Sequence, residues 1–327
     1  MKIALIGTGV LGTGVGLTLL SQGHELRCHN RTEANAAAVV EAGAVWCASP
    51  GEAIDGASHV IILVWDESAL HAVLDGPQGL LLHARPGQVF IDMSTQLPHT
   101  ARTSAQALAT KGAMFVDAPV HGSRAEAHSG GLWVMAGGDA PAWAAALPVL
   151  QAVGATAHHM GPVGAGCAAK LCGNHLVSAM LAALAESLAM ARKSGLDCEE
   201  LITLWGESDF RSPIIEGAGR AMLRDEHAVS FHLRTMVKDT ELIRNHSEAI
   251  GVPVMLSNTV HELNKVAQNL GWGELNATAI FKLFELMAGM GGIGGIGGAG
   301  AAGEAGEAGG ASGMAAAQGR HATGPAA

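Results

Sequence analysis

The sequence of 327 residues contains no tyrosine, few aromatic residues and few charges. The missing tyrosine excludes every mechanism in which a tyrosine hydroxyl is the general acid. Charged residues make up 15% of the chain, and the formal net charge is -10 without any long run of lysine or arginine. Because non-specific nucleic-acid binding depends on cationic contacts to phosphates, this composition argues against a nucleic-acid partner and against a basic membrane-surface role.

Signals for disulfides, metal sites and membrane spans are also missing. The five cysteines are an odd number and include no CxxC pair, which favours reduced thiols over a disulfide or metal site. The sequence shows neither an unbroken apolar run long enough to span a membrane nor a secretory signal. We therefore expect a soluble, cytoplasmic protein without a membrane span or a bound metal.

Hydrophobic residues make up 49% of the chain, which is ample for a core, and the length suggests two domains. In residues 1–160, short apolar runs alternate with longer stretches of helical pattern, and several runs are continuous in Val, Ile and Leu. This pattern is typical of strands buried on both faces of a parallel sheet, and it predicts a doubly wound α/β domain. The predicted strands are Lys2–Ile6, Glu25–His29, Ala44–Cys47, Val60–Val64, Gln88–Ile91, Met114–Asp117 and Leu132–Ala136.

Strand-like runs stop near Gly161, and helical patterns continue through residues 161–290. One long helix is predicted over Ala165–Ser194. Gly195 follows it, and glycine is typical of the position directly after a helix. The second domain is therefore predicted to be all helical. In residues 291–327, 14 of 37 residues are glycine and 12 are alanine, so we interpret this segment as a disordered tail.

A glycine motif, Gly7-Thr8-Gly9-Val10-Leu11-Gly12, follows the first predicted strand and opens a helix. In this context GxGxxG indicates a dinucleotide site: Gly7 permits the tight turn, Gly9 lets the backbone approach a pyrophosphate, and Gly12 allows close helix–strand packing. The free N–H groups of the helix N-terminus would bind the anion.

The second predicted strand ends in Cys28-His29-Asn30-Arg31-Thr32, without the acidic residue that usually binds the ribose 2′-hydroxyl of NAD. Asn30, Arg31 and Thr32 offer a positive charge and hydrogen bonds for a 2′-phosphate instead. We therefore predict a preference for NADP over NAD, with NAD still possible. Val64 and Trp65, at the end of the strand predicted over residues 60–64, are also predicted to bind the cofactor.

Lys170 and Asn174 lie four residues apart near the start of the long apolar helix, and hence on one helix face. Burial and the helix N-terminus both disfavour the charged lysine, so its pKa should fall toward neutrality, as a general acid requires. By spacing alone, a lysine that reaches solvent beside an exposed asparagine is the commoner arrangement.

Several motifs occur in a fixed order: the glycine loop, Asn30-Arg31-Thr32, Ile91-Asp92-Met93-Ser94-Thr95, residues 117–123, residues 130–135, Lys170-Leu171-Cys172-Gly173-Asn174, and Lys238-Asp239. With this order, residues 1–290 resemble the β-hydroxyacid dehydrogenase family, which includes 3-hydroxyisobutyrate dehydrogenase, tartronate semialdehyde reductase, glyoxylate/succinic semialdehyde reductase and related imine reductases. The resemblance implies a Rossmann domain followed by a helical domain, commonly dimerised through the helical part. It also implies hydride transfer between a nicotinamide and a small 3-hydroxy acid or its semialdehyde.

Residue roles follow from the resemblance by position. Lys170 matches the catalytic lysine of the family and Asn174 its partner. Thr95 matches a residue on the nicotinamide side of the cofactor. Lys238 matches a lysine that reaches the active site from the helical domain, and it is predicted to contact both cofactor and substrate. Gly122 and Ser123 fall in the stretch that binds the substrate carboxylate.

One position departs from the family pattern. His121 stands where the family usually has a serine, whose hydroxyl is thought to hold the substrate carboxylate. A protonated imidazole would still bind a carboxylate, with a pH dependence, and it could instead reshape the pocket for a substrate that is not an acid.

The leading hypothesis is an NADP(H)-dependent oxidoreductase that interconverts a small 3-hydroxy acid and its semialdehyde, with Lys170 as general acid and base. The alternatives are an NADPH-dependent imine reductase and a non-catalytic NADP-binding scaffold. A homodimer or homotetramer formed through the helical domain is expected.

Overall fold

The computed structural model describes residues 1–290, so the predicted tail at 291–327 lies outside the described residues. Within residues 1–290, nine strands form one sheet, in the order β3-β2-β1-β4-β5-β6-β8-β7, with β9 paired to β8. Strands β1 to β6 are parallel, β6 and β7 are antiparallel to β8, and β9 is parallel to β8. The strands are β1 (Lys2–Ile6), β2 (Glu25–His29), β3 (Val45–Trp46), β4 (His59–Ile62), β5 (Val89–Asp92), β6 (Met114–Asp117), β7 (Val120–His121), β8 (Leu132–Gly137) and β9 (Gly154–Gly161).

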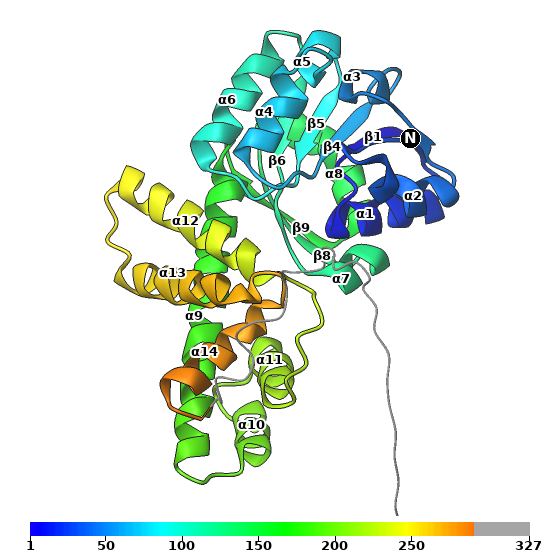
Figure 1. Cartoon of the computed structure of the whole chain (residues 1–327). Helices are drawn as coiled ribbons and strands as arrows, with labels where there is room; N and C mark the ends of the chain where they lie inside the picture. Colours follow the sequence, from blue (N-terminus) through cyan, green and yellow to red (C-terminus); the bar gives the residue numbers. More distant parts are fainter. Residues whose placement is uncertain (291–327) are drawn as a thin grey trace, which may run out of the picture. The chain divides into compact units, whose positions relative to one another are not determined.

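Helices cover both faces of the sheet (Figure 1). Side chains alternate along β1, so that Ile3 and Leu5 enter one core while Ala4 and Ile6 enter the other. Helices α1, α2 and α8 pack in the first core, and α3 to α6 pack in the second. The helices of this region are α1 (Val10–Ser21), the 3-10 helix η1 (Glu33–Ala36), α2 (Ala37–Glu41), α3 (Pro50–Ala53), α4 (Glu67–Asp75), α5 (Leu80–His83), α6 (Pro98–Ala109), α7 (Arg124–Ser129) and α8 (Ala140–Val153).

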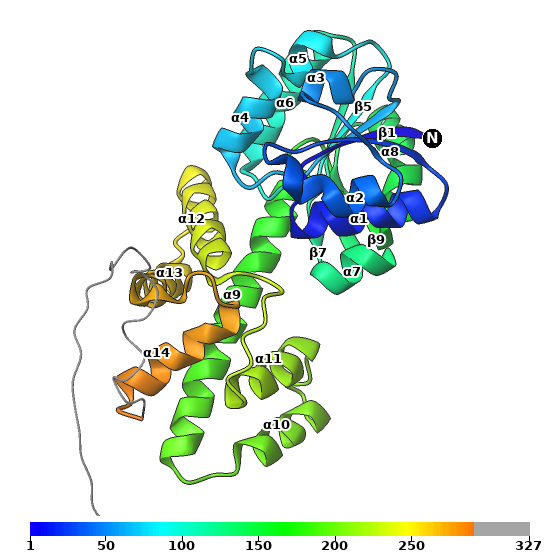
Figure 2. The same cartoon turned by 45° about the vertical axis from the view of Figure 1, so that its right-hand side comes forward.

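The second region is helical, and α9 is its central element (Figure 2). Apolar side chains of α9 share a core with α10 to α14. The elements are α9 (Ala165–Lys193), α10 (Cys198–Glu207), α11 (Pro213–Leu223), α12 (Leu233–Ile250), α13 (Met255–Ala267), the π-type turn η2 (Gln268–Trp272), the 3-10 turn η3 (Ala277–Ala279) and α14 (Ile280–Met287). The predicted Rossmann-type sheet followed by a helical domain entered through one long helix is confirmed.

Helix α9 is the one described helix that is long and apolar enough to cross a membrane, by length and composition alone. Its most apolar 18 residues have a mean hydropathy of 1.3, and 44% of them are buried inside the protein. Central helices of globular proteins pass the same test, and α9 contacts β8, α11, α12 and α14.

A carboxylate from the sheet binds the N-terminus of α9. Asp117, the last residue of β6, accepts hydrogen bonds from the N–H groups of Gly164 and Cys167, both at 2.8 Å. Gly166 must lack a side chain here, because a Cβ would lie 2.4 Å from the Met135 carbonyl oxygen. A carboxylate at a helix N-terminus is stabilised by the helix dipole, so Asp117 joins the sheet to the helical region.

Two strands, β7 and β9, were missed from the sequence. β9 has the sequence GATAHHMG, without a continuous apolar run, and none of its residues is fully buried. It lies at the edge of the sheet and pairs only with β8, so its side chains are largely exposed. β7 has two residues, too few to show a period. Pairing with β8 forms both strands, and that pairing is a tertiary contact without a local signal.

Candidate functional site

The glycine loop joins the end of β1 to the start of α1. Gly7 has a φ of +100°, and a Cβ there would lie 2.1 Å from the Leu63 carbonyl oxygen. A Cβ on Gly12 would lie 2.1 Å from the Gly7 carbonyl oxygen. Both positions therefore require glycine: Gly7 for its backbone conformation and its contact, and Gly12 so that the loop can close on the helix.

The N-terminus of α1 is suited to an anion. Gly9 is its N-cap residue and makes no side-chain capping bond, which leaves the first N–H groups of the helix to other partners. A Cβ on Gly9 would meet nothing within 4 Å, so the space beside the backbone is open. Thr8, Val10 and Leu11 complete this loop. Open space next to free N–H groups fits a pyrophosphate, and these residues would hold it.

The end of β2 is tied to the glycine loop. The N–H of Thr8 donates to Asn30 Oδ1 at 3.1 Å, and Asn30 Nδ2 donates to the Thr32 carbonyl oxygen at 2.8 Å. Asn30 therefore links the glycine loop to the segment that follows β2. The neighbouring Arg31 is exposed and makes no ion pair with any residue between 1 and 290.

The segments that follow β4 and β5 lie side by side. The N–H of Val64 donates to Ser94 Oγ at 2.9 Å, and the N–H of Ser94 donates to Asp92 Oδ1 at the same distance. Thr95 follows directly and is half-buried. In an open α/β sheet, ligands bind outside the carboxyl ends of the strands, which is where these residues lie.

Trp65 connects the sheet region to α12. The Arg234 guanidinium lies 5.0 Å and the Lys238 ammonium 5.6 Å from the centre of its ring. Both are cation–π distances. These side chains border an open groove of about 600 Å³ that also includes Val237, Glu241, His261, Lys265 and Gln268. Its cations outnumber its one carboxylate, so the groove favours anionic ligands.

Lys170 is buried, with 8% of its surface exposed. Burial lowers its pKa to about 8, the Asp239 carboxylate opposes this fall, and the Lys238 ammonium adds to it. Its Nζ lies 3.3 Å from His121 Nδ1 on β7. A lysine with a pKa near neutrality can both give and take a proton at physiological pH.

Asn174 is buried one turn after Lys170 and belongs to a polar cluster with α12. Its Nδ2 donates to Asp239 Oδ2 at 2.7 Å, and Lys238 Nζ lies 2.9 Å from Asp239 Oδ1. Asp239 is 1% exposed, so both carboxylate oxygens are shielded from water. The structure thus brings Lys170, Asn174 and Lys238 into one neighbourhood, with Asp239 as the common carboxylate.

The ring of His121 packs against α9. A Cβ on Gly173 would lie 2.2 Å from His121 Nε2. Burial, together with the charge of Lys170, lowers the pKa of His121 to about 4. The imidazole is therefore neutral at neutral pH, and the protonated ring considered from the sequence is not the form present beside Lys170.

Gly122 and Ser123 start α7. Gly122 has a φ of +117°, and Ser123 forms a capping box with Glu126. The Ser123 hydroxyl donates to Glu126 Oε2 at 2.8 Å, and the Ser123 N–H donates to the same oxygen at 2.7 Å. Ser123 is thus engaged in capping, and none of its hydrogen bonds within residues 1–290 reaches Lys170 or Asn174.

Two buried carboxylates end neighbouring strands, since Asp92 on β5 is paired in register with Asp117 on β6. Burial raises the pKa of Asp117 to about 6. Burial, with a smaller contribution from the charge of Asp117, raises the pKa of Asp92 to about 7. Asp92 Oδ2 has no hydrogen-bond partner among the described residues.

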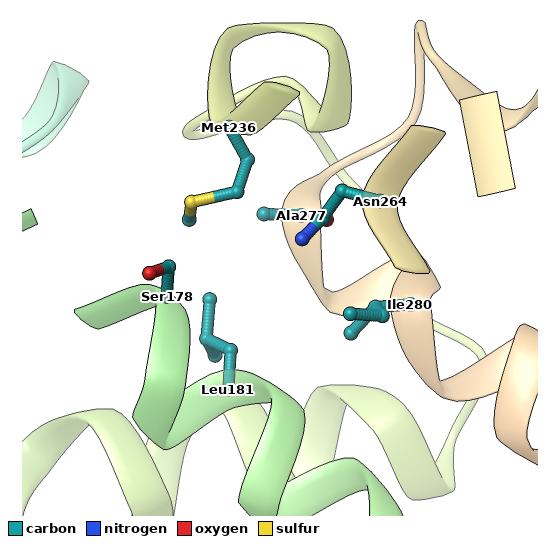
Figure 3. Close-up of a pocket in the computed structure, with 6 residues that line it drawn as sticks. All are labelled: Ser178, Leu181, Met236, Asn264, Ala277 and Ile280. Atoms are coloured by element: carbon teal, nitrogen blue, oxygen red, sulfur yellow. The ribbon is translucent and has the colours of Figure 1, made fainter. Parts of the chain in front are cut away.

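A gap in the helical region is too small to hold a water molecule, and its lining is packed (Figure 3). Ser178 and Leu181 come from α9, Met236 from α12 and Asn264 from α13. This gap is therefore a packing feature and not a ligand site. Within residues 1–290, no three His, Cys, Asp or Glu side chains are grouped to hold a metal ion.

Three contributors were not identified from the sequence: Asp239 as the buried carboxylate, Arg234 over Trp65, and Gly173 beside His121. Arg234 and Lys238 are four residues apart, so their shared helix face was readable from the spacing. Only the tertiary contact with α9 reveals that Asp239 is buried, and only the position of His121 explains Gly173.

Comparisons with known proteins agree with this geometry. Residues 2–161 match the NAD binding domain of 6-phosphogluconate dehydrogenase, and residues 164–284 match the NAD-binding domain of NADP-dependent 3-hydroxyisobutyrate dehydrogenase. The chain is 30% identical to glyoxylate/succinic semialdehyde reductase 1 of Arabidopsis thaliana over 86% of this chain and 98% of that protein. It is 31% identical to 2-(hydroxymethyl)glutarate dehydrogenase of Eubacterium barkeri over 87% of this chain and 95% of that protein.

A solved structure shows the same fold. The 3-hydroxyisobutyrate dehydrogenase of Salmonella typhimurium has a TM-score of 0.79 to this chain and 25% identity, covering 86% of this chain and 99% of the other. The family uses NAD(P) as cofactor. The two domain matches and the similar proteins agree with the glycine loop and the buried lysine. The chain belongs to the β-hydroxyacid dehydrogenase family, and it is an NAD(P)-dependent dehydrogenase or reductase that acts on CH–OH groups.

Proposed function

We propose that the protein reversibly interconverts a small 3-hydroxy acid and its semialdehyde with NADP(H), using Lys170 as general acid and base. Residues 1–160 would bind the cofactor, and residues 161–290 would contribute the substrate site and the subunit interface. The single observation that supports this most is Lys170, a buried lysine with a pKa of about 8 at the start of α9.

The bound dinucleotide would supply or accept the hydride. In reduction, the Lys170 ammonium donates a proton to the oxygen of the carbonyl as it becomes an alkoxide. In oxidation, the neutral amine of Lys170 accepts the hydroxyl proton. A pKa of about 8 leaves both forms of the lysine populated near neutral pH, which suits a reversible reaction.

Asn174 and Lys238 would orient the substrate. Because Asn174 donates to Asp239, the side-chain amide has one orientation and its carbonyl oxygen is directed to another partner. Among residues 1–290, Asn174 Oδ1 accepts no hydrogen bond, so a substrate hydroxyl could donate to it. Lys238 contacts both Asp239 and Trp65, and its charge lowers the pKa of Lys170.

His121, Gly122 and Ser123 are proposed to contact the substrate carboxylate, with Thr95 on the nicotinamide side of the site. A neutral His121 would offer a hydrogen bond and not a charge. The neutral ring also supports the second candidate function, reduction of an imine, because a pocket in which His121 carries no positive charge is less selective for an acid. Lys170 supports the first candidate, since an alkoxide needs a proton donor.

A preference for NADP is supported by Arg31. This side chain is exposed at the end of β2, near Asn30 and Thr32, and no ion pair within the described residues competes for it. No acidic residue lies at positions 28–32 to bind a ribose 2′-hydroxyl. Arg31 would pair with a 2′-phosphate.

A homodimer or homotetramer through the helical region is part of this proposal. It is supported by apolar side chains that are exposed there, including Leu176 at 63%, Met190 at 67% and Met255 at 83%. Sedimentation of the full chain would measure the assembly, and a monomer at micromolar concentration would contradict it.

The test is consumption of NADPH and NADH with succinic semialdehyde, glyoxylate, tartronate semialdehyde, methylmalonate semialdehyde and a cyclic imine. Turnover of an acidic aldehyde, faster with NADPH, is the expected result. Turnover of the imine alone would favour the second candidate. Binding of NADPH without turnover of any compound would favour a scaffold and contradict both catalytic proposals.

A further inference from the structure

His121 fills a space beside Lys170 that exists because residue 173 has no side chain. Its Nδ1 is 3.3 Å from Lys170 Nζ, while a Cβ on Gly173 would lie 2.2 Å from Nε2 and 2.7 Å from Cε1. Any larger residue at position 173 would push the ring away. The contact between His121 and Lys170 therefore depends on Gly173.

The chemistry of the two groups gives the direction of this hydrogen bond. A lysine ammonium has three donors and no acceptor, so His121 Nδ1 must accept and the ring proton must be on Nε2. The pKa of His121 is about 4 and that of Lys170 about 8, so the proton stays on the lysine. His121 consequently acts as an acceptor and not as a proton relay.

Few groups compete for Lys170. The other charged side chains that face it are Asp239 and Lys238, both from α12. Asp239 is engaged with Asn174 and Lys238. Among residues 1–290, His121 is the only hydrogen-bond partner of Lys170 Nζ.

We propose that His121 is a positioning residue that holds the Lys170 ammonium through Nδ1, and that Gly173 makes this arrangement possible. The inference rests on the proposed role of Lys170 as general acid and base. It assigns the Nδ1 side of His121 to the lysine, while the Nε2 side packs against Gly173.

A hydrogen bond to the charged form favours that form, so loss of the acceptor should lower the pKa of Lys170. Reduction needs the protonated lysine, so activity persists below this pKa and falls above it. Removing the acceptor should therefore move the fall in kcat/KM for reduction to lower pH.

The first experiment compares His121→Leu with His121→Asn in full pH profiles. Leucine has a similar size and no acceptor, whereas the asparagine carbonyl oxygen takes the place of Nδ1. For His121→Leu we expect kcat to decrease by up to about tenfold. The fall in kcat/KM should move to lower pH by about one unit. His121→Asn should retain the wild-type profile. A wild-type profile in His121→Leu would overturn the proposal.

The second experiment uses Gly173→Ala, with Gly217→Ala on α11 as the matched control, because a Cβ on Gly217 meets nothing within 4 Å. Gly173→Ala should reproduce the shift of His121→Leu, and Gly217→Ala should not. In a His121→Ala background, Gly173→Ala should have no further effect on kcat. Additive effects in the double variant would contradict the dependence of His121 on Gly173.

A third measurement does not need turnover. Nitrogen-15 NMR of labelled histidines, with His121→Asn to assign the resonance, should show His121 protonated on Nε2 and neutral down to about pH 5. Protonation on Nδ1 would overturn the proposal. If the wild-type protein turns over no substrate, the proposed function fails while this measurement still decides the contact between His121 and Lys170.

Discussion

The two halves of the site are built in different ways. The cofactor loop uses backbone and space, since Gly7, Gly9 and Gly12 leave room for an anion next to free N–H groups. The catalytic half uses ionisable side chains that are shielded from water: Lys170 and Asp239 are buried and His121 is half-buried, and they come from α9, α12 and β7. The first half is contiguous in the chain, and the second exists only where three elements meet. Substitutions should therefore affect the halves through different quantities: cofactor affinity in one, and rate and pH dependence in the other.

The largest expected effect separates the halves directly. Lys170→Met removes the proton donor, so kcat should fall by about 10²- to 10⁴-fold while the affinity for NADPH stays within a factor of about two. Steady-state kinetics and fluorescence titration would measure the two quantities. Lys193→Met, on an exposed position of the same helix, is the matched control. Near-normal turnover in Lys170→Met would defeat the assignment of Lys170.

A second prediction concerns stability and the buried carboxylates. Asp92 has a pKa of about 7 in the folded protein and about 4 when unfolded, so the folded state binds a proton more tightly. Stability from this group is fully present below about pH 4 and is lost as pH rises through 7. Over the whole interval, the change should amount to roughly 4 kcal/mol in the free energy of unfolding.

Asp92→Asn should therefore remove much of this pH dependence. Urea unfolding at several values between pH 5 and 8 would measure it, with the exposed Asp209→Asn as control. The prediction is wrong if Asp92→Asn and the wild-type protein lose stability equally over that range.

A third prediction concerns the open space at Gly9. Because a Cβ there meets no protein atom, Gly9→Ala should keep the melting temperature of the cofactor-free protein. It should weaken NADPH binding by about ten- to hundredfold, because the backbone N–H groups can no longer approach the pyrophosphate. In contrast, Gly7→Ala should destabilise the protein itself. Calorimetry of both variants would decide, and equal NADPH affinity in Gly9→Ala and wild type would contradict the site.

The smallest effect is expected at the edge of the cofactor site. Arg31→Ala should raise KM for NADPH by about tenfold and leave KM for NADH nearly unchanged, since only NADP carries the 2′-phosphate. Arg85→Ala, another exposed arginine of the sheet region, serves as control. An equal change for both cofactors would remove Arg31 from the explanation of specificity.

The sequence alone predicted the parts of the structure that have local signals. β1, β2 and β6 begin and end where their apolar runs predicted, and α9 ends one residue earlier than expected. The glycine loop was predicted with its cofactor class, because a strand, three spaced glycines and a helix are contiguous. The edge strands β7 and β9 were missed, since their residues become strand only by pairing with β8.

Only the tertiary structure decided the character of the catalytic half. From spacing alone, a solvated Lys170 beside an exposed Asn174 is the commoner arrangement. Burial is what lowers the pKa of Lys170. Burial also keeps the imidazole of His121 neutral. The sequence therefore showed that His121 replaces the usual serine of the family, but it did not predict the charge of the ring. Hydrophobic patterns and turn residues act over a few positions and are readable in the chain. The protonation state of a buried group depends on dehydration and on charges brought together from distant segments, and these exist only in the folded protein.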